Sequence, residues 1–69
     1  MSTIVITLNG ERREVPGPGS LAGLLGHLGL DPRLVVVELN REIVRRPRLD
    51  DTTLADGDSV ELVHFVGGG

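Results

Sequence analysis

The sequence predicts one α+β domain, in which a short helix packs on a mixed sheet of four to five strands, in the order β-β-α-β-β-β. Three observations support this fold class. The chain has 69 residues, enough for one domain. Two segments with strand and hairpin signals flank the only stretch with helical periodicity. Cysteine is absent, so no disulfide can supplement a core made almost entirely of Ile, Leu and Val.

The first hairpin is predicted at the N-terminal end. Residues 4–8 are apolar or β-branched, which is typical of a strand. Asn9-Gly10 follows, and both residues tolerate the positive φ angles of a tight hairpin turn. Residues 12–15 then form the second strand, and Pro16 ends it. The Pro- and Gly-rich residues 16–19 are a loop.

A helix is predicted after this loop. Ser20 is a suitable N-cap, because its hydroxyl can accept a hydrogen bond from a free N–H of the first turn. Gly29 ends the helix, since glycine readily adopts the left-handed conformation. Leucines recur at the i, i+3, i+4 and i+7 spacing of one helix face, at Leu21, Leu24, Leu25 and Leu28.

The second half of the chain predicts three more strands. Residues 35–39 and 42–44 form a hairpin that turns at 40–41. Residues 51–54 are predicted to be a short turn or 3₁₀ segment, and residues 56–58 a tight turn. The last strand is predicted at 59–65, and residues 67–69 are a flexible tail of three glycines after a domain at 1–66.

The first and last strands are the most apolar, so we place them side by side at the centre of the sheet, where they can run parallel. This arrangement is the β-grasp, or ubiquitin-like, fold. The period-two alternation of a strand predicts which side chains face the helix, namely Ile4, Ile6, Leu8, Val60 and Leu62. It places a second set on the open face, namely Val5, Val63 and Phe65.

Composition argues against several classes of function. The formal net charge is −3 and Phe65 is the only aromatic residue, so the chain lacks the basic surface and stacking platforms of a nucleic-acid binder. No apolar run approaches the ~20 residues that a membrane span needs. The N-terminal residues lack a signal-peptide pattern, which predicts a cytoplasmic protein with no membrane association.

The side chains inside the domain offer little catalytic chemistry. His27 lies off the leucine stripe and is predicted to be a solvated helix residue, and His64 is predicted to be structural. Asp56-Gly57-Asp58 resembles part of a calcium loop, yet the later bidentate Glu is missing. These carboxylates fit turn chemistry, or steering towards a basic partner. We therefore predict no bound metal or cofactor, and no enzymatic activity of the chain alone.

The C-terminal residues suggest a different chemistry. Glycine lacks a Cβ, so residues 67–69 suit a narrow channel in an enzyme. The carboxylate of Gly69 is an anion and a poor electrophile, but conversion to an acyl-adenylate makes it reactive. A sulfur nucleophile can then displace AMP and leave a thiocarboxylate. A frayed end with no function is the alternative interpretation.

Over essentially its whole length, the chain resembles the ThiS family of sulfur carriers in thiamine biosynthesis. The matching features are the first strand with Asn9-Gly10, the leucine-rich helix after Ser20, and residues 37–44, 54–58 and 60–69, of which the last segment is the most specific. The resemblance implies that an E1-like adenylyltransferase of the ThiF type activates the chain with MgATP. It implies that a cysteine desulfurase or other persulfide donor supplies sulfur, and that a thiazole synthase of the ThiG type receives it.

The resemblance also assigns roles to residues. Gly68 and Gly69 form the modified terminus, with Gly69 as the reacting residue. Phe65, Val66 and Gly67 are the part of the tail that each partner holds. A docking patch is inferred at Val5, Val63 and Phe65, and the free chain is expected to be a monomer.

Two alternatives remain open from the sequence. The small subunit of molybdopterin synthase uses the same fold and the same terminal thiocarboxylate with a different client protein. A β-grasp interaction module without terminal chemistry belongs to another functional class. Binding to thiazole synthase and removal of Gly68 and Gly69 are the two tests that separate these interpretations.

Overall fold

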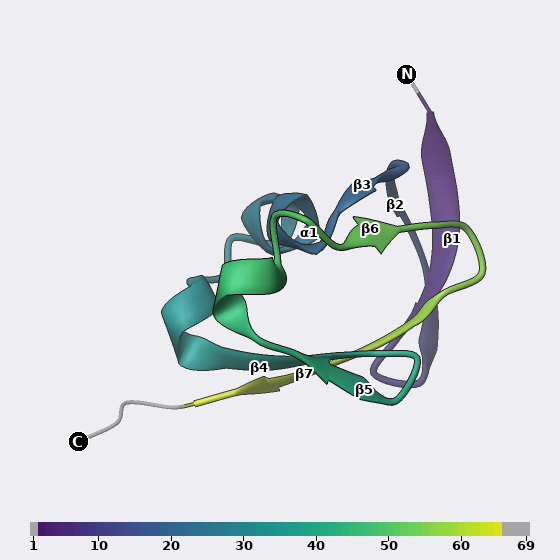
Figure 1. Cartoon of the computed structure of the whole chain (residues 1–69). Coiled ribbons are helices and arrows are strands. Elements are labelled where there is room, and N and C mark those ends of the chain that lie inside the picture. The colour runs from purple at the N-terminus through teal and green to yellow at the C-terminus, as the bar shows by residue number, and fades with distance from the viewer. Residues whose placement is uncertain (1, 66–69) are drawn as a thin grey trace.

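The structure, a computed structural model, describes residues 2–65. Five strands form the main sheet in the order β2-β1-β7-β4-β5, and α1 crosses one face of it (Figure 1). The bounds of these elements are β1 (Thr3–Leu8), β2 (Glu11–Pro16), α1 (Leu21–Leu28), β4 (Val35–Leu39), β5 (Glu42–Val44) and β7 (Ser59–His64). The predicted α+β class with a mixed sheet and one helix is confirmed.

The centre of the sheet is the predicted pair of terminal strands. β1 and β7 run parallel, with Thr7 opposite Ser59 and Leu8 opposite Val60. The other pairs in this sheet, β1–β2, β4–β5 and β4–β7, are antiparallel. β7 therefore lies between β1 and β4, so the last described strand is the central strand of the sheet.

The helix covers the core as the leucine spacing predicts. The Ser20 hydroxyl accepts a hydrogen bond from the Gly23 N–H at 3.0 Å, and Gly29 ends the helix at φ 72°. The core that the helix shares with the sheet consists of buried aliphatic side chains, at Ile4, Ile6, Leu8, Val15, Leu21, Leu24, Leu25, Val37, Leu49, Leu54 and Val60. Of the predicted core residues, Leu62 and Leu28 are half-buried at its margin.

Two asparagines in hairpin turns hold β7 from opposite sides. Asn9 and Asn40 both have φ near 50°, a left-handed conformation that asparagine tolerates better than most residues. The Asn9 Oδ1 accepts a hydrogen bond from the Leu62 N–H at 2.7 Å. The Asn40 Oδ1 accepts one from the Ser59 N–H at 2.9 Å. Each turn therefore closes a hairpin and also fixes the backbone of the strand that precedes the glycine tail.

The acidic turn before β7 is used for backbone hydrogen bonding. The Asp56 Oδ1 accepts from the Val5 N–H at 2.7 Å, and the Asp58 Oδ2 accepts from the Ala55 N–H at 2.8 Å. Gly57 has φ 89° between them. These contacts agree with the interpretation of this segment as turn chemistry.

Several short elements were not predicted. A second, two-stranded sheet pairs β3 (Gly19–Ser20) with β6 (Thr53–Leu54), where the sequence predicted a turn or 3₁₀ segment at 51–54. The 3₁₀ turns lie elsewhere, at η1 (Pro32–Leu34) and η2 (Arg46–Arg48). β7 ends one residue earlier than predicted, at His64. The predicted boundary at residue 66 and the tail at 67–69 fall outside the described residues.

Candidate functional site

The last strand carries the chain out of the domain at one end of the sheet. The Phe65 N–H donates a hydrogen bond to the Leu34 carbonyl oxygen at 2.7 Å, one step beyond the β4–β7 ladder. Phe65 is the last described residue. This hydrogen bond anchors its backbone, while its side chain is exposed. The domain therefore fixes the position of Phe65, the residue at which the described chain ends.

The turn η1 supplies the anchor for Phe65 and is itself held by a charged contact. The Asp31 Oδ1 accepts from the Arg33 backbone N–H at 2.9 Å, and the Arg33 Nη2 lies 2.7 Å from the Asp31 Oδ2. These hydrogen bonds from Arg33 lower the pKa of Asp31 from 3.8 to about 2. The Asp31 carboxylate is therefore ionised at neutral pH, and the turn that presents the Leu34 carbonyl keeps its cap.

Exposed apolar side chains gather beside this exit. The exposed fractions are 54% for Val63, 51% for Phe65, 65% for Ile43 and 44% for Leu34. Val63 lies opposite the half-buried Val36 in the β4–β7 register. We define the open-face patch as Val36, Ile43, Val63 and Phe65, which share the face of the sheet opposite α1. Exposed apolar side chains that cluster in this way are typical of a protein interaction surface.

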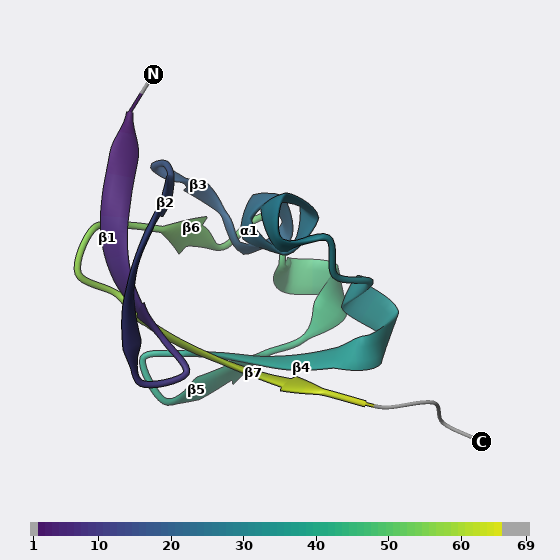
Figure 2. The same cartoon turned by 180° about the vertical axis from the view of Figure 1, so that it is seen from behind.

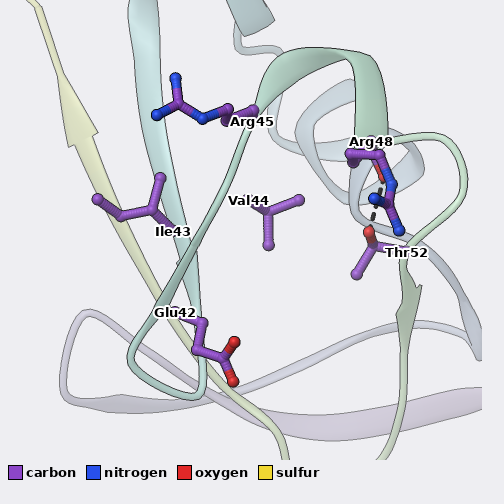
Figure 3. A pocket seen from close by; sticks show the side chains of 6 residues that line it. All are labelled: Glu42, Ile43, Val44, Arg45, Arg48 and Thr52. Atoms are coloured by element: carbon purple, nitrogen blue, oxygen red, sulfur yellow. Dashed lines mark hydrogen bonds between the residues drawn. The ribbon is translucent and has the colours of Figure 1, made fainter.

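The arrangement of the layers keeps this patch accessible. In Figures 1 and 2, α1 lies above β4, β5 and β7, and no element among residues 2–65 covers the lower face of these strands. Figure 3 shows Ile43 and Arg45 on one side of β5 and Val44 on the other, which agrees with the alternation of a strand. The patch therefore lies on the bare face, and Arg45 lies next to it.

Two carboxylates border the open-face patch. Glu38 and Glu61 are directly opposite each other on β4 and β7, and Ile43 is opposite Glu38 on β5. Like charges that face each other across two strands destabilise a sheet. Among residues 2–65, neither glutamate forms an ion pair. This face thus combines an apolar surface with negative charge that the fold itself does not neutralise.

The predicted docking residues do not all come together. Val63 and Phe65 lie in the open-face patch, but Val5 lies at the other end of β7. The Gly57 N–H donates to the Val5 carbonyl oxygen at 2.8 Å, and Val63 is six positions beyond Gly57. Val5 lies two positions before Thr7, which faces Ser59, and Val63 lies four positions after Ser59, so six strand positions, roughly 20 Å, separate the two valines. A role of Val5 in binding a partner stays a prediction, separate from the patch.

Two residues of the patch were missed by the sequence analysis. Val36 stands in a run of three valines, so alternation could not show which of them faces away from the core. Ile43 belongs to a strand of three residues, too short for a pattern. Val36 and Ile43 could be assigned to the open face only from the residues that they pair with on neighbouring strands, and this pairing is known only from the structure.

Other candidate positions show no converging chemistry. His27 and His64 are both exposed. Within residues 2–65 no three or more His, Cys, Asp or Glu side chains are grouped to hold a metal ion. A depression of about 330 Å³ lies beside β5, where the Arg45 and Arg48 side chains point in different directions (Figure 3). The Thr52 hydroxyl there donates to the Arg48 carbonyl oxygen at 2.7 Å, so it is engaged within the fold.

The predicted reactive residue Gly69 lies outside the described residues. The same holds for the other predicted tail residues, Val66, Gly67 and Gly68.

No helix within residues 2–65 is long and apolar enough to cross a membrane.

Comparisons with known proteins identify similar sequences and structures, and the matched family model includes the C-terminal residues. Residues 6–69 match the family model of the ThiS family. The sulfur carrier protein ThiS of Bacillus subtilis is 43% identical over 51 residues, which cover 74% of this chain and 77% of that protein. The crystal structure of the thiamine biosynthesis protein ThiS from Geobacter metallireducens has a TM-score of 0.82 and 39% identity, and the match covers 96% of this chain and 100% of that one.

Longer proteins also contain a similar segment. A thiazole synthase of Paramagnetospirillum magneticum is 42% identical over 64 residues, which cover 93% of this chain and 20% of the relative. The chain thus spans about a fifth of the length of the thiazole synthases that it matches. The fold matches that of the ThiS crystal structure over nearly the whole chain and the family model covers residues 6–69, so the chain belongs to the ThiS family.

Proposed function

We propose that this chain is the sulfur carrier for formation of the thiazole part of thiamine, and that the carboxylate of Gly69 carries the sulfur. The observation that supports this most directly is the family match, which extends through Gly69. The anchored end of β7 and the open-face patch beside it supply what a carrier needs, namely a fixed point of exit and a docking surface. The proposal concerns the chain that ends at Gly69, as in the printed sequence.

The proposed chemistry takes place in partner enzymes. An E1-like adenylyltransferase transfers AMP from MgATP to the Gly69 carboxylate and releases pyrophosphate. A persulfide then attacks the acyl carbon, AMP leaves, and a thiol reduces the S–S bond to free the thiocarboxylate. The carrier contributes the acyl group, and its side chains take no part in the bond changes. We therefore class the chain as a protein co-substrate and not as an enzyme.

The proposed acceptor of the sulfur is thiazole synthase. Relatives with that name contain a segment like this chain within one polypeptide, which supports a functional association of the two. A molybdopterin synthase partner and a module without terminal chemistry have no comparable support. The adenylyltransferase, the persulfide donor, the monomeric state and the cytoplasmic location stay predictions.

The experiment that tests the proposed function is the intact mass of the chain after incubation with an E1-like enzyme, MgATP and a persulfide donor. The expected gain equals replacement of one oxygen by sulfur, and fragmentation should place it on Gly69. Omission of ATP is the control and should leave the mass unchanged. An unchanged mass with an enzyme that thiocarboxylates another ThiS protein would refute the proposal.

The open-face patch gives a second prediction. Val63→Ser should weaken binding to thiazole synthase about tenfold, because removal of one apolar contact at an interface costs about 1 kcal/mol or more. Thr7→Ser is the control, since it also removes a methyl group from an exposed side chain on the same face, and Thr7 lies opposite Ser59, roughly 13 Å along β7 from Val63. Calorimetric titration of both variants measures the effect. Equal losses in the two variants would mean that the patch is not a distinct binding surface.

A further inference from the structure

The strand β7 has two edges, and only one of them is paired along the whole strand. On the β4 side, the register runs from Leu39 opposite Val60 to Val35 opposite His64, and the Phe65 N–H continues it. On the β1 side, the register ends after Leu8 opposite Val60. In Figure 1, β7 continues beyond the β1–β2 turn with only β4 beside it.

The turn at Asn9 makes the last contacts on the β1 side. The Asn9 N–H donates to the Val60 carbonyl oxygen at 2.9 Å, and its side-chain Oδ1 accepts from the Leu62 N–H at 2.7 Å. Alternate residues of a strand direct their backbone groups to opposite edges. The next groups on this edge are therefore the Leu62 carbonyl and both backbone groups of His64. Within the part of the chain that the structure describes, no protein hydrogen bond to these groups is found.

An unpaired strand edge is a template for another strand, and proteins usually block it with Lys, Pro or a bulge. Residues 62–65 contain neither Lys nor Pro. This edge also belongs to the strand that leads directly to the glycine tail, and it adjoins the open-face patch. Pairing here would fix a partner's backbone beside the end of β7, while the patch supplies side-chain contacts.

We propose that an extended segment of thiazole synthase adds to the sheet along this edge of β7 and hydrogen-bonds to the backbone of His64. The inference rests on the proposed function, and it specifies how the partner holds the carrier. Thiazole synthase is the chosen occupant because its relatives carry a segment like this chain in the same polypeptide.

Amide hydrogen exchange, read residue by residue by NMR, tests the strand addition. In the free chain, the His64 N–H should exchange fast, while the Val63 and Phe65 N–H groups are protected by β4. In the complex with separately purified thiazole synthase, exchange of the His64 N–H should slow at least tenfold. A complex in which the His64 N–H exchanges as before would overturn the strand addition and leave the carrier function intact. Failure to form any complex would overturn it as well, and the terminal mass would then decide the carrier function alone.

A pair of variants separates the backbone from the side chain. His64→Pro removes the N–H on the open edge and keeps the β4 ladder, because proline is tolerated at a strand edge where its nitrogen faces outward. It should weaken binding about tenfold, the value of one or two net hydrogen bonds. His64→Ala keeps the N–H and should bind within about twofold of the parent. Equal affinities of the two variants, with unchanged melting temperatures, would contradict the inference.

Discussion

A chain without Gly68 and Gly69 is expected to lose thiocarboxylate formation by about 100-fold or more, because misplacement of a reacting group by even about 1 Å can cost that much. The shortened chain still ends in a glycine, Gly67, but its carboxylate lies roughly 7 Å short of the original position. The described fold ends before the tail, so the free energy of unfolding should change by less than about 0.5 kcal/mol. Intact mass and urea unfolding measure the two effects.

A length-matched variant, Gly68→Ala with Gly69→Ala, serves as the control for this deletion. This variant keeps the full length of the tail and adds two methyl groups. It therefore separates the effect of side-chain bulk in the enzyme channel from the effect of a shorter tail. Sulfur uptake by the shortened chain at the rate of the full chain would show that the position of the terminus is irrelevant. That result would overturn the assignment of the sulfur to Gly69, whereas binding to thiazole synthase without any sulfur uptake by the full chain would favour an interaction module.

The largest expected effect on stability is at the two turn asparagines. The double variant Asn9→Ala, Asn40→Ala should lose about 4 kcal/mol, because each site loses a hydrogen bond and a residue that tolerates the left-handed conformation, about 1 kcal/mol for each. The whole domain is expected to be stable by roughly 3–10 kcal/mol, given ~0.05–0.15 kcal/mol per residue. The double variant should therefore lose about 40% or more of this stability, as urea titration followed by circular dichroism can show.

Glycine at both positions provides the matched control. The variant Asn9→Gly, Asn40→Gly accepts the positive φ angles but lacks the two amide oxygens that bind the Leu62 and Ser59 N–H groups. It should lose about 2 kcal/mol, the hydrogen-bonding part alone. An alanine double variant within about 1 kcal/mol of the parent would disprove the stabilising role that we assign to the turns.

The elements with strong local signals could be predicted from the sequence. The Asn9-Gly10 turn, the Ser20 cap, the leucine spacing and the two apolar terminal strands each have a local physical cause, and the structure confirms all four. The parallel centre of the sheet followed from the apolar character of those strands. The β-grasp arrangement could therefore be predicted without knowledge of which residues pair across the sheet.

The missed elements depend on contacts between distant segments. β3 and β6 are two residues each, and Ser20 pairs with Thr53 far along the chain. The turn at Asn40-Arg41 was predicted, but the sequence did not indicate the left-handed conformation of Arg41, at φ 72°, where glycine would be the usual choice. In the candidate site, alternation identified the exposed face of Val63 and Phe65. It could not show that the parallel register separates Val5 from them.

The central place of β7 has a mechanical consequence. A pull applied at Phe65 acts on β7 along the strand axis. β1, β4 and the two turn amides oppose such a pull together, since their hydrogen bonds run across the direction of the force. The bonds are loaded in shear and must yield as a group, so the described domain resists unravelling from the Phe65 end.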